Sequence, residues 1–533
     1  MTRAPTLEQT ASDQDSRITL AQWLVILSAS IGALLEVIDV SITNVALIHI
    51  QASLGATLAE VGWVVTGYAI ATVIMIPLSE WLGEQFGQRN YFIFCLIGFT
   101  AASLLCGLAP NLPALVLARV LQGLLGGGLL PKAQAILFRT VPPALQGVAQ
   151  GVFGIVILTG PALGPTLGGL LTDSLGWRWV FFINVPIGIL NVALALSALE
   201  PDARDPDNPR RRQRIDWVGI LLMAASLGGL QLVLEQGHQY DWFDNPGIRN
   251  LGLLALVGLP TFVIWELRRR DPAVDLRVLR HRYLAAGSVF SFVLGIGLYG
   301  TIFVIPIFAQ SILGYTATQT GLLILPGALA SAVTMGVLGR NAQRFDPRLL
   351  ITVGAVLMVI TMLSLSSIGP DTGTDQLFWP LIMRGITTVM MFLPLSLATL
   401  GPLPRLEVGA GSGFYNLSRQ LGGTFGIAGL TVVLDHQMAI HRAQLVELMP
   451  RTSPLLQERL YEMQAFLSMG GEGGDLARRR ALELLDHQLQ RQAALLAYGD
   501  VFRAVALVFA LAIPLVLLLG QGPKGIQQAT RRS

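Results

Sequence analysis

Residues 21–46 read AQWLVILSASIGALLEVIDVSITNVA, an almost unbroken apolar run that holds two acidic residues, Glu36 and Asp39. A helix of about 20 mainly apolar residues crosses the roughly 30 Å hydrocarbon core of a bilayer, because all its backbone groups pair within the helix. An ionisable group at that depth costs at least about 2.5 kcal/mol, so it needs a partner, water or a function. The segment therefore predicts a membrane-spanning helix whose two carboxylates, three residues apart on one face, point into a helix bundle.

The rest of the chain has the same apolar character. Of its 533 residues, 53% are hydrophobic and 13% are charged, and the mean hydropathy is +0.60. Soluble domains carry about 25% charged residues, so we expect an all-α integral membrane protein. Fourteen apolar runs are long enough to be transmembrane helices, and they cover approximately 21–46, 58–78, 91–109, 113–138, 147–172, 178–198, 216–236, 248–267, 284–312, 319–339, 348–368, 377–400, 408–434 and 500–520.

The arginines in the connections predict the orientation. Short cytoplasmic loops are enriched in Lys and Arg. Arginines gather in every second connection, namely in those with Arg89, Arg139, residues 204–214, residues 268–282, residues 340–348 and Arg405, whereas the short connections between them hold Arg178 and Arg249. This alternation predicts a multi-pass protein of the plasma (inner) membrane with both termini cytoplasmic.

Several features recur eight spans later, which is typical of a duplicated bundle. Arg119 of span 4 corresponds to Arg384 of span 12, and Gly147 of span 5 to Gly409 of span 13. Two six-helix bundles would then flank an inserted pair of helices, an architecture typical of transporters. The predicted division is a cytoplasmic tail over 1–20, a first bundle over 21–199, an inserted pair with basic loops over 200–282, a second bundle over 283–521 that includes an outer connection over 436–497, and a cytoplasmic tail over 522–533.

Glu36, Asp39 and Arg119 are the candidates for proton coupling. Two carboxylates one turn apart in hydrocarbon disfavour simultaneous ionisation, so one of them is suited to exchange a proton near neutral pH. Asp39 and Arg119 lie at similar depth in their spans, which allows them to pair. A carboxylate that stays permanently paired with arginine is the alternative interpretation.

Other polar residues at membrane depth predict a substrate cavity. Lys132 either extends to the inner surface or contributes a cation to the cavity that Glu36 lines. In span 13 the polar residues suggest a wet cavity wall, and they are Tyr415, Asn416, Arg419 and Gln420.

Span 5 is rich in glycine and proline. Gly160, Pro161, Gly164 and Pro165 allow a neighbouring helix to approach closely and allow the helix to bend. We expect a pivot here, with a plain packing interface as the alternative.

The outer connection 436–497 contains as many acidic residues as arginines. Its leucines suggest two amphipathic helices, with a break between them at Gly470, Gly471, Gly473 and Gly474. It is interpreted either as a solvated cap or as a docking surface for a partner.

At these residues the chain resembles the EmrB/QacA-type exporters, the fourteen-span drug:proton antiporters of the major facilitator superfamily. Residues 38–47 (IDVSITNVAL) resemble the span-1 motif, residues 119–123 (RVLQG) the span-4 motif, and residues 160–165 (GPALGP) the span-5 antiporter motif, the most specific of the three. Residues 176–179 (GWRW) with Asn184 and Pro186 are similar to a hallmark of the subfamily. In the gating loop after span 2, the acid, glycine and base of the family correspond to Glu84, Gly87 and Arg89, whereas Glu80 stands where the family usually has glycine.

The resemblance implies a major facilitator fold with two inserted helices and a proton-coupled secondary active exporter that works by alternating access. It implies that Asp39 carries the proton and that Arg119 takes part in its transfer. The expected substrates are lipophilic small molecules, with cations favoured by Glu36, and members of the EmrB branch work with a periplasmic adaptor and an outer-membrane channel. The alternative is export of an anionic or amphipathic metabolite, fatty acid or siderophore, with Lys132 and Arg419 binding the anion.

Other classes of protein fit the sequence poorly. The chain has no G-x-x-x-x-G-K-[ST] loop for a nucleotide-driven pump, and no catalytic His or Ser pairs within the spans. Its basic residues form no patch for nucleic acid, and Cys95 and Cys106 are about 16 Å apart along one predicted helix. We therefore expect a transporter and not an enzyme, with no cofactor and no metal site, and the coupled carboxylate disfavours a passive channel.

Overall fold

The computed structural model describes residues 18–201, 215–342, 344–367, 369, 373–449, 453–469 and 474–519. Every regular element in these ranges is helical, which confirms the all-α prediction. The predicted tail residues 1–17 and 522–533, the arginines of 204–214, and Gly470, Gly471 and Gly473 lie outside the described residues.

The helices cover the predicted spans, two spans contain a break, and α2, α3, α16 and α18 extend well beyond the predicted ends. The α-helices are α2 (Leu20–Leu54), α3 (Leu58–Phe86), α4 (Gln88–Leu108), α5 (Leu112–Gly126), α6 (Leu129–Thr140), α7 (Gln146–Leu175), α8 (Trp179–Phe182), α9 (Asn184–Ala198), α10 (Trp217–Gln236), α11 (Pro246–Arg268), α12 (Arg282–Ser311), α13 (Ala317–Asn341), α14 (Pro347–Ser366), α15 (Thr374–Leu400), α16 (Val408–Glu447), α17 (Pro454–Met469) and α18 (Gly474–Ala512). The short 3₁₀ helices are η1 (His238–Tyr240), η2 (Trp242–Asp244), η3 (Leu276–Arg280) and η4 (Ile513–Leu518).

Thirteen helical segments in the described part of the chain are long and apolar enough to cross a membrane. The predicted span 408–434 is not among them, although it forms the first part of α16 and packs against α3, α12 and α18. Its polar residues explain the difference, because Asn416, Arg419 and Gln420 lower the hydropathy of a helix that is buried in protein and not in lipid. With α16, the bundle contains the fourteen predicted segments.

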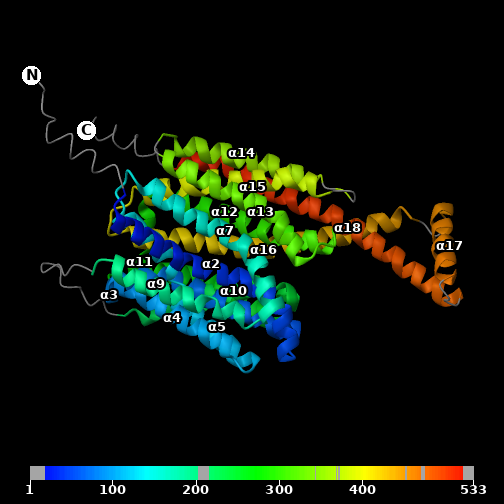
Figure 1. Ribbon diagram of the computed structural model, residues 1–533, viewed down its shortest axis with the longest axis horizontal. Coiled ribbons are helices and arrows are strands. Elements are labelled where there is room, and N and C mark those ends of the chain that lie inside the picture. Colours follow the sequence, from blue (N-terminus) through cyan, green and yellow to red (C-terminus); the bar gives the residue numbers. More distant parts are fainter. Residues whose placement is uncertain are drawn as a thin grey trace, which may run out of the picture.

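The long helices run side by side, and the described chain begins and ends at the same end of the bundle (Figure 1). We call this the α2-start end, because α2 begins there; α3 and α6 end there and α16 begins there. In one group α2 packs on α6, α7 and α9, and in the other α12 packs on α15, α16 and α18. The pair α10 and α11 packs beside α3 and α16. The division into residues 21–199, 200–282 and 283–521 stays a prediction.

The outer connection differs from the predicted pair of amphipathic helices. Residues 436–447 continue α16, α17 crosses the tip, and α18 starts at Gly474, so the ends of two long helices project from the bundle (Figure 1). The 40 residues of α16 extend about 60 Å at 1.5 Å per residue, about twice the hydrocarbon thickness. The glycine run does separate α17 from α18, whereas the break between α16 and α17 was not predicted.

The glycine-rich α7 packs closely against α2. A Cβ atom on Gly164 would lie 2.1 Å from Ser41 Oγ, so only glycine permits this distance. Pro165 has no N–H to pair with the carbonyl of Pro161, and Ser41 Oγ donates to that carbonyl instead (2.9 Å). The motif residues therefore form a tight contact between the helix that carries Asp39 and its neighbour.

Candidate functional site

Asp39 and Arg119 form an ion pair in the interior of the first bundle. Arg119 Nη1 donates to Asp39 Oδ2, and both side chains are fully buried. Gln122 Nε2 (3.0 Å) and Asn184 Nδ2 (2.8 Å) donate to the other oxygen, Oδ1. Asn184 begins α9 after the break at α8, and its amide also reaches Ser103 of α4 (3.1 Å). Residues of α5 and α9 thus hold the carboxylate that α2 carries.

Arg119 is fixed on its other sides as well. Its Nε donates to the carbonyl of Val64 in α3 (3.0 Å), and its Nη1 also donates to Gln122 Oε1 (2.8 Å). The guanidinium lies over the ring of Tyr68, 4.2 Å from the ring centroid. A buried ion pair of this kind is strongly destabilised if one partner loses its charge, because the other is left uncompensated.

Glu36 lies one turn from Asp39 on α2 but has a different environment. Span 4 breaks at Gly127 and Gly128, so α6 begins in the middle of the membrane-spanning segment and exposes the free N–H groups of its first turn. Leu130 N donates to Glu36 Oε2 (2.9 Å). A helix N-terminus favours a carboxylate. In the described part of the chain, Glu36 Oε1 has no hydrogen-bond partner.

Arg419 is a buried cation of the second bundle. It is 1% exposed, and its Nη2 donates to Asn416 Oδ1 (2.6 Å) one turn earlier in α16. Its Nε and Nη1 have no hydrogen-bond partner among the described residues, and neither has the hydroxyl of Tyr415. The guanidinium lies 5.4 Å from the ring centroid of Phe392 and 5.9 Å from that of Tyr415. Gln420 is partly exposed.

A polar network joins the two bundles beside Arg419. Asn416 Nδ2 donates to Gln134 Oε1 of α6 (2.7 Å), and Gln134 Nε2 donates to Ser396 Oγ of α15 (2.9 Å). Ser412 Oγ donates to the carbonyl of Pro131 (2.8 Å). These contacts lie toward the α2-start end, so the bundles are connected on that side of Glu36 and Arg419.

Lys132 is placed apart from Glu36 and Arg419. Its ammonium group pairs with Glu80 and donates to Gln88 Oε1 (2.7 Å), and Arg139 Nη2 donates to Glu80 Oε1 (2.7 Å). We call Glu80, Gln88, Lys132 and Arg139 the Glu80 cluster. Lys132 is 1% exposed, so it neither reaches the surface nor stands as a free cation. Among the described residues, Lys132 contacts neither Glu36 nor Arg419, so none of its hydrogen bonds or ion pairs supports the predicted place in the substrate cavity.

The Glu80 cluster also touches the second bundle. The Glu80 carboxylate lies against the first turn of α16, since a Cβ on Gly409 would be 1.8 Å from Glu80 Oε2. Arg139 Nε donates to the carbonyl of Arg405 (3.2 Å). A carboxylate at a helix N-terminus interacts favourably with the free N–H groups and the dipole. The cluster therefore links α3 and α6 to the start of α16.

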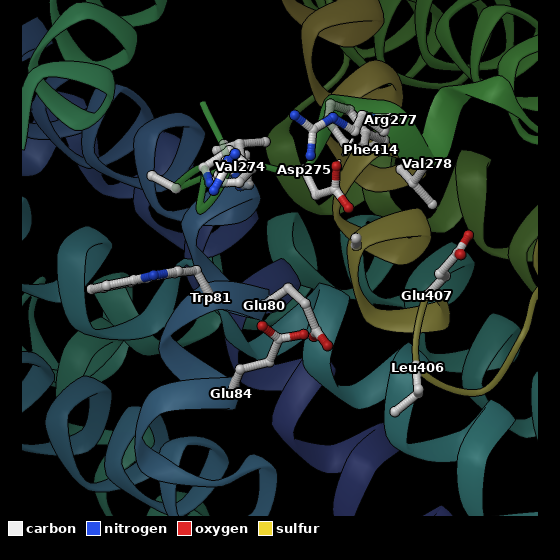
Figure 2. Close-up of a pocket in the computed structure, with 15 residues that line it drawn as sticks. Glu80, Trp81, Glu84, Val274, Asp275, Arg277, Val278, Leu406, Glu407 and Phe414 are labelled. Atoms are coloured by element: carbon white, nitrogen blue, oxygen red, sulfur yellow. Dashed lines mark hydrogen bonds between the residues drawn. The ribbon is translucent and has the colours of Figure 1, made fainter. Parts of the chain in front are cut away.

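A cavity of about 210 Å³ lies at the α2-start end between α3, the segment before η3 and the start of α16. In Figure 2, Glu80, Trp81 and Glu84 face the chain around Val274 and Asp275, with Leu406 and Glu407 on the other side; the fifteen lining residues include Phe414 as well. Glu407 pairs with Arg280 (2.7 Å), and the exposed Glu84 has no ion pair among the described residues.

The rest of the gating loop ends α3 and starts α4. Gly87 adopts a φ of +93°, a conformation that glycine reaches without a Cβ penalty. Arg89 Nη2 donates to the carbonyl of Leu196 at the end of α9 (2.9 Å). Gly87 thus supplies the turn, and Arg89 ties the loop to the first bundle.

Sequence reasoning missed the role of four residues in these contacts. Glu80 and Lys132 were recognised as unusual charges, but their separation of 52 residues gives no sign that they pair. Gln134 and Gln122 were not singled out. The triple glycine 126–128 in span 4 is the signal that predicts the α6 start and hence the N–H group that meets Glu36.

Comparison with known proteins agrees with this geometry. The family described as Major Facilitator Superfamily matches residues 29–427. The chain is 32% identical over 495 residues to the fatty acid resistance protein FarB of Neisseria gonorrhoeae, a match that covers 93% of this chain and 95% of that protein. It is 30% identical over 493 residues to the multidrug export protein EmrB of Escherichia coli (strain K12), with coverage of 92% and 94%.

Two solved structures share the fold. The human organic anion transporter MFSD10 (TETRAN) aligns with a TM-score of 0.54 and 13% identity over 92% of this chain and 99% of that chain. The proton:xylose symporter XylE aligns with a TM-score of 0.54 and 14% identity over 91% and 94%. The predicted facilitator fold is confirmed.

Proposed function

Because the chain belongs to the major facilitator superfamily, as an EmrB-type multidrug transporter, we propose that it exports lipophilic small molecules in exchange for protons that bind at Asp39. The observation that carries this assignment is the buried Asp39–Arg119 pair, in which each oxygen of the carboxylate is held by hydrogen bonds. The protein is a transporter and not an enzyme, and drug efflux coupled to protons is general for the family.

The coupling follows from the cost of separating the pair. When a proton neutralises Asp39, Arg119 stays buried without its counter-ion, a state that costs about 3–5 kcal/mol. Movement of α5 relative to α2 then relieves that cost. One returning proton supplies about 2.3 kcal/mol per 100 mV and about 1.4 kcal/mol per pH unit, enough for a concentration gradient of one to two decades.

Alternating access is supported by the position of the contacts between the bundles. The Glu80 cluster and the Gln134 contacts connect the two bundles toward the α2-start end. With the arginine-rich connections inside, this end faces the cytoplasm, both termini are cytoplasmic, and the protein lies in the inner membrane. The described conformation is then closed on the cytoplasmic side.

The relatives are named for fatty acid resistance, multidrug export and colistin resistance, and these names do not point to one substrate charge. The charged groups of the site are therefore the basis for the substrate proposed here. Glu36 is a largely buried residue that keeps one carboxylate oxygen for which the described residues supply no donor, which favours lipophilic cations. On this assignment Glu36 attracts the cation and Asp39 exchanges the proton.

The helices that project from the opposite end support the assignment of an adaptor contact on the periplasmic side. At the tip, Tyr461 and Phe466 are each more than three-quarters exposed. Large exposed apolar side chains beyond the bundle are typical of interaction sites. A periplasmic adaptor and an outer-membrane channel would continue the export path from there.

The coupling role is tested with Asp39→Asn in proteoliposomes. We expect proton-driven substrate accumulation to be lost, whereas exchange of labelled for unlabelled substrate without a pH gradient continues, because the bundles still move. The matched control is Asp173→Asn, an exposed carboxylate at the end of α7. Full proton-driven accumulation by Asp39→Asn refutes the role.

The adaptor contact is tested by replacing residues 454–469 with a flexible linker and co-purifying the adaptor from the same membrane. We expect adaptor recovery to fall while transport in proteoliposomes, which needs no adaptor, is kept. Unchanged recovery of the adaptor would exclude α17 as its contact.

A further inference from the structure

The inserted pair α10 and α11 holds a buried carboxylate that the proposed function does not use. Glu266, in the last turn of α11, is 1% exposed, and neither of its oxygens has a hydrogen-bond partner among the described residues. Asp216, which caps the start of α10, is also buried. A Cβ atom on Gly219 would lie 2.5 Å from Glu266 Oε1 and 3.0 Å from Asp216 Oδ2, so the two carboxylates approach the same point of α10.

Asp216 has the partners that Glu266 lacks. Trp265 Nε1 donates to Asp216 Oδ2 (2.9 Å), Gly219 N donates to Oδ1 (3.1 Å), and Arg269 Nε lies 3.5 Å from Oδ2. These contacts stabilise the charge of Asp216. A buried charge without donors or a counter-ion is costly. The described packing therefore fits Glu266 as a neutral, protonated acid beside an ionised Asp216.

Few other groups act on Glu266. Asp216 and Arg269 are the charged residues that influence it, and Arg269 is about half exposed and lies beside Asp216. Residues 269–275, which we call the α11–η3 segment, bring the backbone of Ala273 and Val274 near the carboxylate, but neither N–H forms a hydrogen bond with it in the described structure. A single free carboxylate suits a proton better than a hard metal cation, which takes about six or more oxygen ligands. The other charged residues around the end of α11 are exposed, namely Arg268, Arg270 and Asp275.

The α11–η3 segment connects Glu266 to the contact between the bundles. Ala273 and Val274 are 3% and 4% exposed, and they belong to an apolar cluster that includes Ile76 of α3 and Leu417 of α16. The same segment forms one wall of the cavity shown in Figure 2. Displacement of the segment would therefore remove apolar packing that joins α3 of the first bundle to α16 of the second.

We propose that Glu266 is a proton-operated switch: as a neutral acid it keeps the α11–η3 segment packed between α3 and α16, and its ionisation beside Asp216 releases the segment. Two like charges in one buried site repel each other and require water. Because the packed form holds the proton and the released form loses it, a rise in pH favours release and opening of the α2-start end. On the orientation given in the proposed function, the switch responds to cytoplasmic pH, so protons that enter during export would restrain further opening.

The test measures distances between spin labels at Phe86→Cys and Leu406→Cys in the full chain in nanodiscs, from pH 6 to pH 8.5. Every protein compared carries Asp39→Asn, so the coupling carboxylate adds nothing to the pH dependence and the result does not depend on its role in the proposed function. We expect the population of longer distances to rise at least about threefold as the pH rises. With Glu266→Gln, which imitates the neutral acid, the population should stay at its low-pH value.

Asp216→Asn provides a second, independent measurement. It removes the neighbouring negative charge and frees Arg269 to approach Glu266, so the rise in longer distances should move to lower pH. Glu235→Gln, the same change at the other end of α10, is the matched control and should leave the pH dependence unchanged. The proposal is overturned if the distances do not depend on pH while Glu266 is present, if Glu266→Gln keeps the dependence, or if Asp216→Asn leaves its midpoint in place.

Discussion

Two carboxylates one helical turn apart on α2 differ in the groups that they contact. Asp39 has an arginine and two amides, whereas Glu36 has the N-terminus of α6. The arginine ties Asp39 to α5, so a change in its charge acts on the packing of helices. The backbone N–H tied to Glu36 belongs to a helix that is part of the contact between the bundles. The same residue class thus serves two roles according to what it contacts.

The Asp39–Arg119 pair can be tested by a double-mutant cycle on the free energy of unfolding. Arg119→Gln leaves Asp39 buried without a cation and should destabilise the protein by about 3–5 kcal/mol. The double variant Asp39→Asn, Arg119→Gln should be less destabilised than the sum of the single changes, because two neutral amides replace two charges. Denaturant titration in detergent measures the three variants. Additive losses would mean that the pair contributes no coupling energy.

At the scale of the element, the close packing of α7 against α2 depends on glycine, which has no side chain, at the contact. Gly164 faces Ser41, and the carbonyl that Pro165 leaves unpaired is satisfied by that same serine. Steric fit and hydrogen bonding therefore depend on one contact. A pivot at this place, as the motif predicts, would need both helices to keep it.

Gly164→Ala places a methyl group on Ser41 and should destabilise the protein by about 1–3 kcal/mol and reduce export, because α2 and α7 are forced apart. Gly169→Ala, five residues later in the same helix, is the matched control, since a Cβ there meets nothing within 4 Å. Thermal unfolding and export are measured for both. Equal effects of the two substitutions would show that helix propensity, and not the α2 contact, decides the result.

Across the whole molecule, the Glu80 cluster is the place where charge holds the two bundles together. Glu80 is the acid shared by Lys132 and Arg139, and it lies against the start of α16. Without it, two cations face each other beside the first turn of a helix, which repels cations. The connection between the bundles would then weaken at the α2-start end.

We expect Glu80→Gln to open this end, as a longer and broader distance distribution between spin labels at Phe86→Cys and Leu406→Cys. Both positions are exposed and belong to different bundles, and the native Cys95 and Cys106 are buried. Glu60→Gln, at the other end of α3, is the control and should leave the distribution unchanged. An unaltered distribution in Glu80→Gln would exclude the cluster as a connection that closes this end.

Much of the fold follows from the sequence, because lipid requires long apolar helices and hydropathy reports them directly. The sequence also gives the depth of a residue within its span, and on this basis it correctly predicts that Asp39 and Arg119 lie at similar depth. The sequence does not give the rotation of a helix about its axis or which helices are its neighbours. The pairing of Lys132 with Glu80 and the hydrogen bonds of Gln134 are therefore seen only in the structure. The same limit explains why the sequence left open whether Lys132 extends to the inner surface or contributes a cation to the cavity.

The unbroken length of α16 has a mechanical consequence. This one helix starts beside Glu80, carries Arg419 at mid-depth and ends at Glu447, outside the bundle. It contains no proline, so it acts as a stiff lever arm of about 60 Å. Tilting such a rod by ten degrees displaces its far tip by roughly 10 Å. Opening of the bundle on one side of the membrane would thereby displace the projecting ends of α16 and α18, with α17, on the other side. A partner bound to these projecting helices would be moved in each transport cycle.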